Sequence, residues 1–201
     1  MTIAVTALVF VAVIWAQSLK VEIPLSYDRL RGYSMKWPLA FFYTSNIPVI
    51  LTAALVANIQ LFGSLIEKAV GHATIIGGFS QGQATSGLAF WLGHSNIVEA
   101  IIRGNLQTIK IFQGISHLIF FMVISVVFAL FWVKTSGMDA QAQAKKIVAS
   151  GMQIPGFRKD ERVLEAILSR YITPLTVMGG LTIGALAALT DSLGALTSGT
   201  A

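Results

Sequence analysis

VEIPLSYDRLRGYSMKWPLAFFYTSNIPVILTAALVANIQ, residues 21–60, joins a basic segment broken by proline and glycine directly to a long apolar segment. The apolar part also carries Asn46, Pro48, Asn58 and Gln60. An amide side chain in hydrocarbon is costly unless it is hydrogen bonded, so a membrane helix with several amides usually faces protein or water. This stretch therefore predicts a membrane helix that lines a pathway or a helix interface and is entered from a basic loop.

The whole chain has the composition of a membrane protein. Hydrophobic residues make up 55% of its 201 residues and charged residues only 11%, whereas a soluble domain carries about 25% charged residues. A bilayer crossing needs about 20 predominantly apolar residues in a helix. The sequence predicts an all-α membrane protein, a polytopic helical bundle that forms one domain over residues 1–201. Its expected spans are residues 1–17, 41–65, 111–133 and 174–196.

A signal peptide is the alternative for the first apolar segment. That segment lacks a basic start and leads into a charged loop without a small-residue cleavage site, so we expect a span there.

Lysine and arginine are distributed unevenly between the expected spans. Four lie in residues 18–40 and seven in residues 134–173, but only three lie in residues 66–110. Cytoplasmic loops of membrane proteins are enriched in these residues. We therefore expect residues 18–40 and 134–173 to be cytoplasmic and residues 66–110 to be external.

The first cytoplasmic loop predicts a small β-hairpin. Apolar residues alternate from Val21 to Leu25, Pro24 restricts this strand to a sheet edge, and Gly32 provides a turn before a second extended stretch.

The second cytoplasmic loop predicts two helices separated by a turn. AQAQAKKIVASG, residues 140–151, is typical of a short helix that ends at Gly151, and DERVLEAILSRYI, residues 160–172, is typical of an amphipathic helix. Arg158 and Lys159 then lie at the tip of the turn.

The basic residues of these loops allow two interpretations. Arg29, Arg31 and Lys36 in the hairpin, with Arg158 and Lys159 in the turn, are suited to bind phosphates of lipid headgroups or of RNA. The alternative is that they only determine the orientation of the chain in the membrane.

The expected external loop is rich in glycine and contains the apolar patch GLAFWLG, residues 87–93. A long loop with apolar patches tends to fold back on the protein, so we expect it to cap the bundle.

The sequence contains no recognisable catalytic or metal site. His72, His94 and His117 are 22 and 23 residues apart, without the spacing of three or four that a helical metal site requires. There is no cysteine, which excludes disulfides and thiol nucleophiles, and no nucleophile–base pair is evident. We expect neither a metal, nor another cofactor, nor enzymatic activity. Asp191 is the only acid within a span, and its position near the end of the span favours a structural role over an ion path.

Several long motifs resemble one known family. The quoted stretch closely resembles the C-terminal half of SecY, the alpha subunit of the Sec translocon, in its archaeal form. SGMQIPGFRKDERVLEAILSRYITPLTVMGG, residues 150–180, and GALAALTDSLGAL, residues 184–196, do so as well. The resemblance runs from the sixth to the ninth transmembrane helix and implies half of a clamshell-shaped, protein-conducting channel.

The resemblance also implies residue roles. Ile50 matches the apolar pore ring, and Asn58 matches the lateral gate. Eight residues at 100° each place them about 80° apart around the helix and about 12 Å apart along it, so one helix can serve both surfaces. Arg29, Arg31, Arg158 and Lys159 are similar to ribosome-docking residues, which makes rRNA binding the favoured interpretation of the two basic loops.

The resemblance implies partners and a location. The partners are the N-terminal half of the same subunit, the SecE/gamma and beta subunits, the ribosome, signal sequences and nascent chains, and the lipid bilayer. The location is the archaeal cell membrane, or the ER membrane of a eukaryote. The family's first five helices and its tenth have no counterpart in the sequence, so we expect a fragment or one of two chains that does not conduct alone.

Three other functions remain as alternatives. A secondary transporter is one, although no internal repeat is visible; an intramembrane enzyme and a purely structural membrane subunit are the others.

Overall fold

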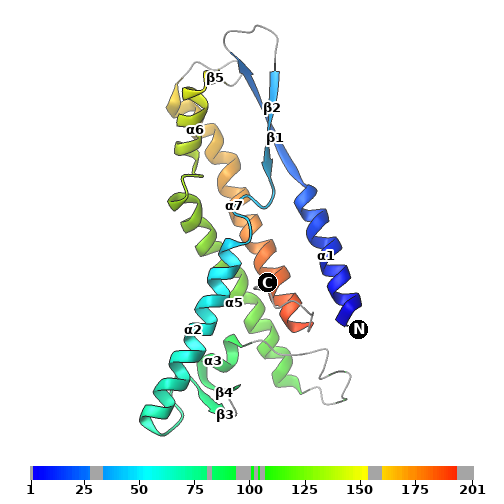
Figure 1. Ribbon diagram of the computed structural model, residues 1–201, viewed down its shortest axis with the longest axis vertical. Helices are drawn as coiled ribbons and strands as arrows, with labels where there is room; N and C mark the ends of the chain where they lie inside the picture. Colours follow the sequence, from blue (N-terminus) through cyan, green and yellow to red (C-terminus); the bar gives the residue numbers. More distant parts are fainter. Residues whose placement is uncertain are drawn as a thin grey trace.

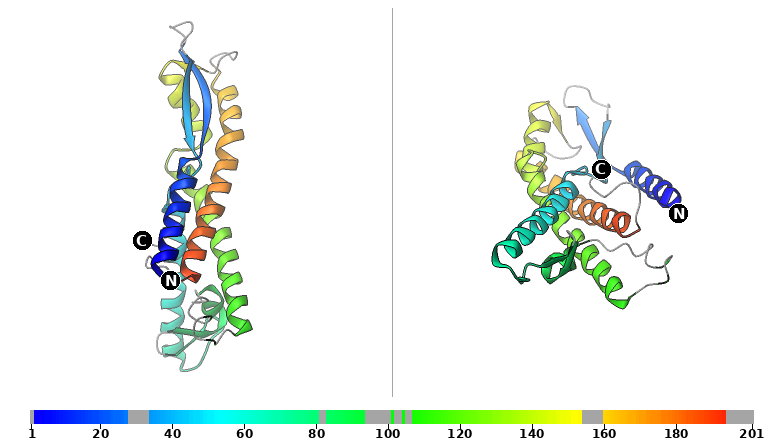
Figure 2. Two further views of the ribbon diagram at one scale, coloured as in Figure 1. Left: turned by 90° about the vertical axis from the view of Figure 1, so that its right-hand side faces the viewer. Right: turned by 60° about the horizontal axis from the view of Figure 1, so that its bottom comes forward.

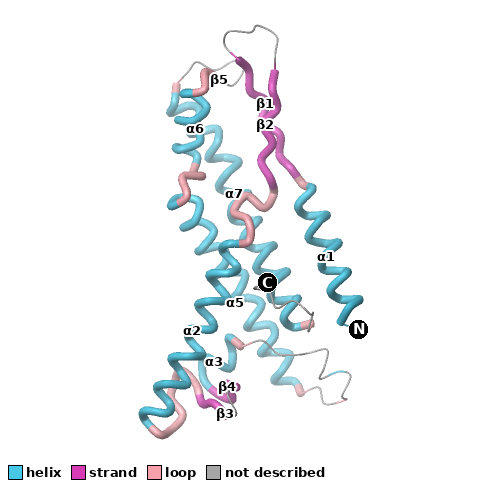
Figure 3. The backbone as a smooth tube through the Cα atoms, viewed as in Figure 1, coloured by secondary structure: helices cyan, strands magenta, loops and turns pink. Residues whose placement is uncertain are grey.

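The computed structural model describes residues 2–27, 34–80, 83–93, 101, 104, 107–153 and 160–193. The described part is elongated, with long helices running along it, a β-hairpin near one end and a second, smaller hairpin near the other (Figures 1 and 3). In chain order the elements are α1 (Thr2–Ser18), β1 (Lys20–Tyr27), β2 (Ser34–Ala40), α2 (Ile47–Val70), β3 (Gly78–Ser80), β4 (Gln83–Ser86), α3 (Gly87–Leu92), α5 (Thr108–Thr135), α6 (Ala140–Ala149), β5 (Met152–Gln153) and α7 (Glu161–Ser192).

Three of the described helices, α2, α5 and α7, are long and apolar enough to cross a membrane. The first expected span also folds as a helix, but α1 has 17 residues, fewer than the roughly 20 of a typical crossing. It lies beside α7 and contacts it (Figure 2). The helical bundle is thus confirmed, and the membrane crossing by α1 stays a prediction.

The helix that contains the second predicted span lies further along the chain than residues 41–65. Helix α2 begins at Ile47, with Pro48 in its first turn, and it ends where Gly71 adopts a left-handed φ of 78° and its N–H binds the carbonyl of Glu67. Proline is tolerated in a first helical turn, where N–H groups have no partner within the helix, and glycine tolerates a positive φ. Helix α2 therefore begins six residues after residue 41 and ends five residues after residue 65, while the membrane boundaries of this span stay a prediction.

The amphipathic segment and the fourth span form a single helix. Helix α7 runs unbroken from Glu161 through Pro174 to Ser192, and the Asp160 carboxylate caps it by accepting a hydrogen bond from the Arg162 N–H at 3.0 Å. The two segments predicted as separate, residues 160–172 and 174–196, are thus continuous in one helix, and the part of α7 that crosses the membrane stays a prediction. Proline is tolerated inside membrane helices when neighbouring packing compensates for the lost hydrogen bond, and here Leu168, Ile172 and Leu175 are buried on both sides of it.

Small residues allow α5 and α7 to approach closely. The backbone of Gly180 lies against Val126 and Ala129, and the backbone of Gly184 lies against Phe121 and Ser125. Glycines at helix crossings permit this packing in membranes.

The predicted hairpin is present and belongs to a three-stranded sheet. Strand β1 pairs antiparallel with β2 along its length, and β5 pairs with only its last two residues, Ser26 and Tyr27. The edge position predicted for this strand was wrong, because β1 lies between β2 and β5. At Pro24 itself, however, β1 is paired with β2 alone, so the proline interrupts no ladder on the β5 side. The sheet packs on α6, α7 and the end of α5, where Ile23, Leu39, Ile147 and Leu164 are buried together.

One hydrogen bond joins the turns that precede α2 and follow α5. The Tyr43 hydroxyl donates to the carbonyl of Met138 at 2.6 Å. Burial, with a smaller contribution from the charge of Asp139, raises the pKa of Tyr43 to about 12.

We predict that Tyr43 makes the protein less stable in strong alkali. An unfolded tyrosine loses its proton near pH 10, whereas folded Tyr43 keeps it to about pH 12. The folded state then binds more protons in this window, so the free energy of unfolding falls as the pH rises from about 10 to 12.

Tyr43→Phe should weaken this decline and lower the free energy of unfolding at neutral pH by about 1 kcal/mol, because the Met138 carbonyl loses its donor. Denaturant unfolding between pH 8 and 12 measures both effects. Tyr171→Phe, at an exposed position, is the control; an equally steep decline in Tyr43→Phe would contradict the prediction.

Candidate functional site

Helix α2 is held by one face. Val49, Val56 and Gly63 are buried on this face, which packs against α5, α7 and the β3–β4 segment. Thr52 lies among them, fully buried, with its Oγ1 at 2.8 Å from the carbonyl oxygen of Pro48 and at 3.2 Å from Ser125 Oγ of α5. Because the single Thr52 proton goes to the carbonyl, Ser125 donates to Thr52. This contact ties α2 to α5 in the middle of the bundle.

The opposite face of α2 is exposed over most of its length. Ile50 is 48% exposed and Leu61 is 55% exposed, and Asn58 lies between them along the chain and is also exposed. At 100° per residue, Ile50 and Leu61 fall within about 20° of each other around the helix, and Asn58 is about 80° from Ile50. The structure therefore places both predicted site residues of α2 on its free face.

The two residues differ in their neighbours on that face. Ala54 and Ala57 complete the narrow apolar stripe of Ile50 and Leu61. Such a stripe can close a passage by excluding water and yields easily, because apolar contacts have no preferred direction. Asn58 instead brings an amide, with two donors and one acceptor oxygen, to a surface otherwise made of aliphatic and aromatic side chains.

The four predicted ribosome-binding residues, Arg29, Arg31, Arg158 and Lys159, lie outside the described residues. The strands that lead to them are described. Ser26 pairs with Gln153, and Tyr27 pairs with Met152. The described residues that precede the two basic segments, Tyr27 and Gln153, therefore lie at the same end of the sheet, which the sequence did not reveal.

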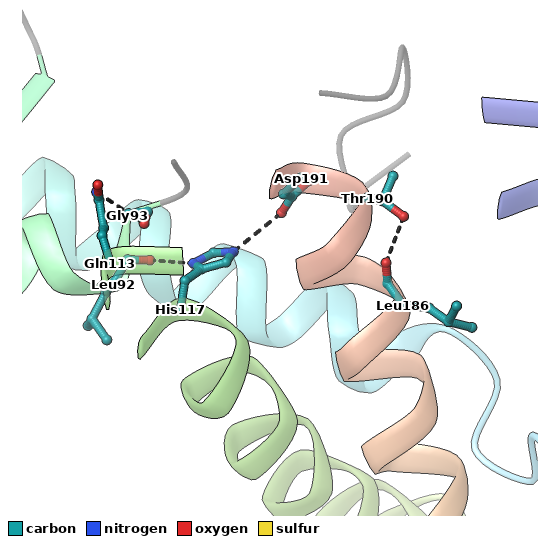
Figure 4. A network of polar contacts seen from close by, with 7 residues as sticks. All are labelled: Leu92, Gly93, Gln113, His117, Leu186, Thr190 and Asp191. Carbon is teal, nitrogen blue, oxygen red and sulfur yellow. Dashed lines mark hydrogen bonds and ion pairs between the residues drawn. The ribbon is translucent and has the colours of Figure 1, made fainter. Parts of the chain in front are cut away.

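A polar cluster connects α3, α5 and α7 near one end of the bundle (Figure 4). Gln113 Nε2 of α5 donates to the carbonyl of Phe90 at 2.8 Å, and His117 Nδ1, one turn further, lies 2.7 Å from the carbonyl oxygen of Leu92. Since a carbonyl only accepts, Nδ1 carries a proton. The other ring nitrogen, Nε2, faces Asp191 Oδ2 of α7 at 3.7 Å.

Sequence reasoning missed this cluster because it treated the histidines as scattered residues and tested them only as metal ligands. The available signal was Gln113 and His117 four residues apart, two polar side chains on one face of an otherwise apolar helix. His72 is exposed and His94 lies outside the described residues. Among the residues that the structure describes, no three histidines, aspartates or glutamates are grouped as metal ligands would be.

Comparison with known proteins agrees with this architecture. The SecY family model matches residues 1–201. The protein translocase subunit SecY of Methanococcus vannielii is 43% identical over 97% of the chain, and that of Methanocaldococcus jannaschii is 40% identical over 97%. The chain spans only 43% of the length of each of these relatives.

Solved structures give the same result. A structure described as that of a protein conducting channel matches 99% of the chain with a TM-score of 0.78 and 40% identity, and the match covers 44% of that chain. A SecY structure concerned with the plug domain and the closed state of the translocation channel matches with a TM-score of 0.79 and 40% identity, over 99% of this chain and 45% of that one.

The fold and the exposed α2 face therefore define a polytopic, α-helical integral membrane protein. The chain belongs to the SecY family.

Proposed function

We propose that the chain forms part of a protein-conducting channel that moves polypeptides across a membrane and inserts membrane proteins into it. The observation that carries the proposal is the division of α2 into a buried face and an exposed face that bears Ile50 and Asn58. A helix fixed along one side can present the other side to a moving chain without leaving the bundle.

In this proposal Ile50 contributes to a ring of apolar side chains that closes the pore, and Asn58 contributes to the gate through which signal sequences pass into lipid. The described part of the chain does not enclose a passage, because the exposed face of α2 has no facing helix within it. The relatives are more than twice as long, which supports an N-terminal half of the subunit as the partner across the pore.

The remaining assignments follow from charge and relationship. The sheet end that bears the basic segments 28–33 and 154–159 is proposed to face the cytoplasm and the ribosome, and residues 66–110 to lie outside. SecE/gamma and beta subunits are the proposed companions in an archaeal cell membrane. The role is passive, and no bond is made or broken by the chain.

Single cysteines on α2 test the proposal sharply, because the chain has no cysteine of its own. In a complex completed by the N-terminal half, Ile50→Cys should crosslink to the mature part of a stalled nascent chain. Asn58→Cys should crosslink to its signal sequence. Ile66→Cys, also exposed on α2 but about 160° from Ile50 around the helix, is the matched control and should give no adduct. Equal labelling at positions 50, 58 and 66 would contradict the assignment of either surface.

A further inference from the structure

A compact unit follows α2, and we name it the cap: residues 74–80 and 83–93, which include β3, β4 and α3. It is folded on itself, since the N–H groups of Leu88 and Ala89 donate to the carbonyls of Ile75 and Ile76 at 3.2 and 2.8 Å. Ala89 is completely buried. The cap is therefore a defined structural unit between two long helices.

The cap is attached to α2 at two places. Glu67 Oε2 accepts a hydrogen bond from the Phe79 N–H at 2.8 Å. One turn earlier, a Cβ added at Gly63 would lie 3.0 Å from both Ile76 and Phe79, so glycine lets the cap rest directly on the helix. A carboxylate acceptor makes this hydrogen bond stronger than a neutral one.

The cap is attached to α5 by the ends of two side chains. Helix α3 has only six residues, too few to be stable alone, and the last carbonyls of a helix lack partners within it. Gln113 Nε2 donates to the carbonyl oxygens of Phe90 and Gly93 at 2.8 and 3.4 Å. His117 Nδ1 donates to the carbonyl oxygen of Leu92 at 2.7 Å. Gln113 is 8% exposed and His117 is 2% exposed, so water does not replace these donors.

His117 also extends the attachment to α7. Its ring is packed against Phe121, with centroids 4.5 Å apart, and this contact helps to hold Nε2 toward Asp191 at 3.7 Å. Figure 4 shows the imidazole between the end of α3 and the end of α7. The buried side chain of His117 thus lies against both α3 and α7.

We propose that Gln113 and His117 are positioning residues that make the cap a strap between α2 and α5. The Thr52–Ser125 contact joins α2 to α5 in the middle of the bundle, and the strap joins the same two helices a second time at the cap. The parts of α2 and α5 between these two connections therefore move as one body. The functional consequence rests on the proposed gate role of α2: the strap keeps α2 and α5 together while α2 acts as a gate helix.

Two substitutions at His117 separate tethering from packing. Asparagine can place its side-chain N–H₂ close to the position of Nδ1 and keeps a donor for Leu92, although it is smaller. Leucine fills more of the space but has no donor. We expect His117→Leu to raise amide hydrogen exchange of the cap, at Phe79 and Ala89, by roughly tenfold, because a buried carbonyl is left unsatisfied. His117→Asn should remain near the parent rate. If His117 only filled space, the smaller asparagine would disturb the cap more than leucine. Faster amide exchange of the cap in His117→Asn than in His117→Leu would therefore overturn the proposal.

The coupling of the helices has its own measurement. Spin labels at Phe62 of α2 and Ile119 of α5, both exposed, report the distance between the helices in the assembled complex in bilayer discs. The parent and His117→Asn should give one narrow distribution, and His117→Leu a broader one. His72→Leu, at an exposed histidine outside the cap, is the matched control and should behave as the parent. A narrow distribution in His117→Leu despite fast cap exchange would refute the strap. Both measurements use the resting complex without substrate, so their outcome is independent of the crosslinking test of the channel role.

Discussion

Replacing Gly184 by valine will separate α5 from α7 and is expected to be the most destabilising single substitution that we propose. A Cβ at this position would lie 2.8 Å from the Phe121 carbonyl oxygen, 3.0 Å from Ser125 Oγ and 3.1 Å from Met122 Cα. Two of these atoms belong to the backbone of α5, which cannot move aside as a flexible side chain can. Valine adds two further methyl groups, so the helices must shift apart.

The expected loss is about 3 kcal/mol or more in the free energy of unfolding. Valine is a better helix former than glycine, so helix propensity alone would raise the free energy of unfolding. The expected loss therefore comes from the clash with α5. The displacement also reaches α2, because Ser125 is the partner of Thr52. Gly184→Val should therefore lower both stability and the yield of gate crosslinks at position 58.

Unfolding by a denaturing detergent, compared for the parent, Gly184→Ala and Gly184→Val, measures this loss. Alanine should lie between the other two. Ala166→Val is the matched control, because it adds the same β-branched side chain to α7 at an exposed position, and its effect should stay within about 0.5 kcal/mol. Similar losses at positions 166 and 184 would mean that adding a β-branched side chain anywhere on α7, and not the close approach of α5 at Gly184, is responsible.

Reversing the charges at Arg29, Arg31, Arg158 and Lys159 should reduce ribosome affinity by about two orders of magnitude at low salt. If each cation meets one RNA phosphate, its loss removes roughly one unit from the slope of log affinity against log salt concentration. The fourfold glutamate variant should thus show a slope lower by about three to four. Pairing of β5 with the last two residues of β1 supports joint action, because the described residues that precede the two basic segments, Tyr27 and Gln153, lie at one end of the sheet.

Binding of ribosomes to the reconstituted complex over a salt series measures affinity and slope together. Lys145→Glu with Lys146→Glu is the control, since these exposed cations lie on α6 and change the net charge in the same direction. We expect the control pair to alter the slope little. An unchanged slope in the fourfold variant would leave its four residues as topology signals only.

Much of the fold was predictable because it depends on neighbours in the chain. Apolar runs of sufficient length form α2 and α5, alternation from Val21 to Leu25 forms β1, and the short helix before Gly151 forms α6 where expected. The periodicity of an α-helix also sufficed to place Ile50 and Asn58 about 80° apart, and the structure leaves both exposed.

Other features depend on contacts between distant residues, and only the tertiary structure decided them. Pro174 marks a helix start in local terms, yet α7 continues through it, since buried residues on both sides hold the helix together. His117 has no conspicuous neighbour in the sequence, but the fold brings it to Leu92 and Asp191. The sequence by itself determined the long apolar helices and the basic segments that flank them, but not the six-residue α3. The packing of α5 on α7 and the attachment of the cap decided which polar side chains meet, because a buried donor takes its partner from whatever the folded chain places within about 3 Å of it.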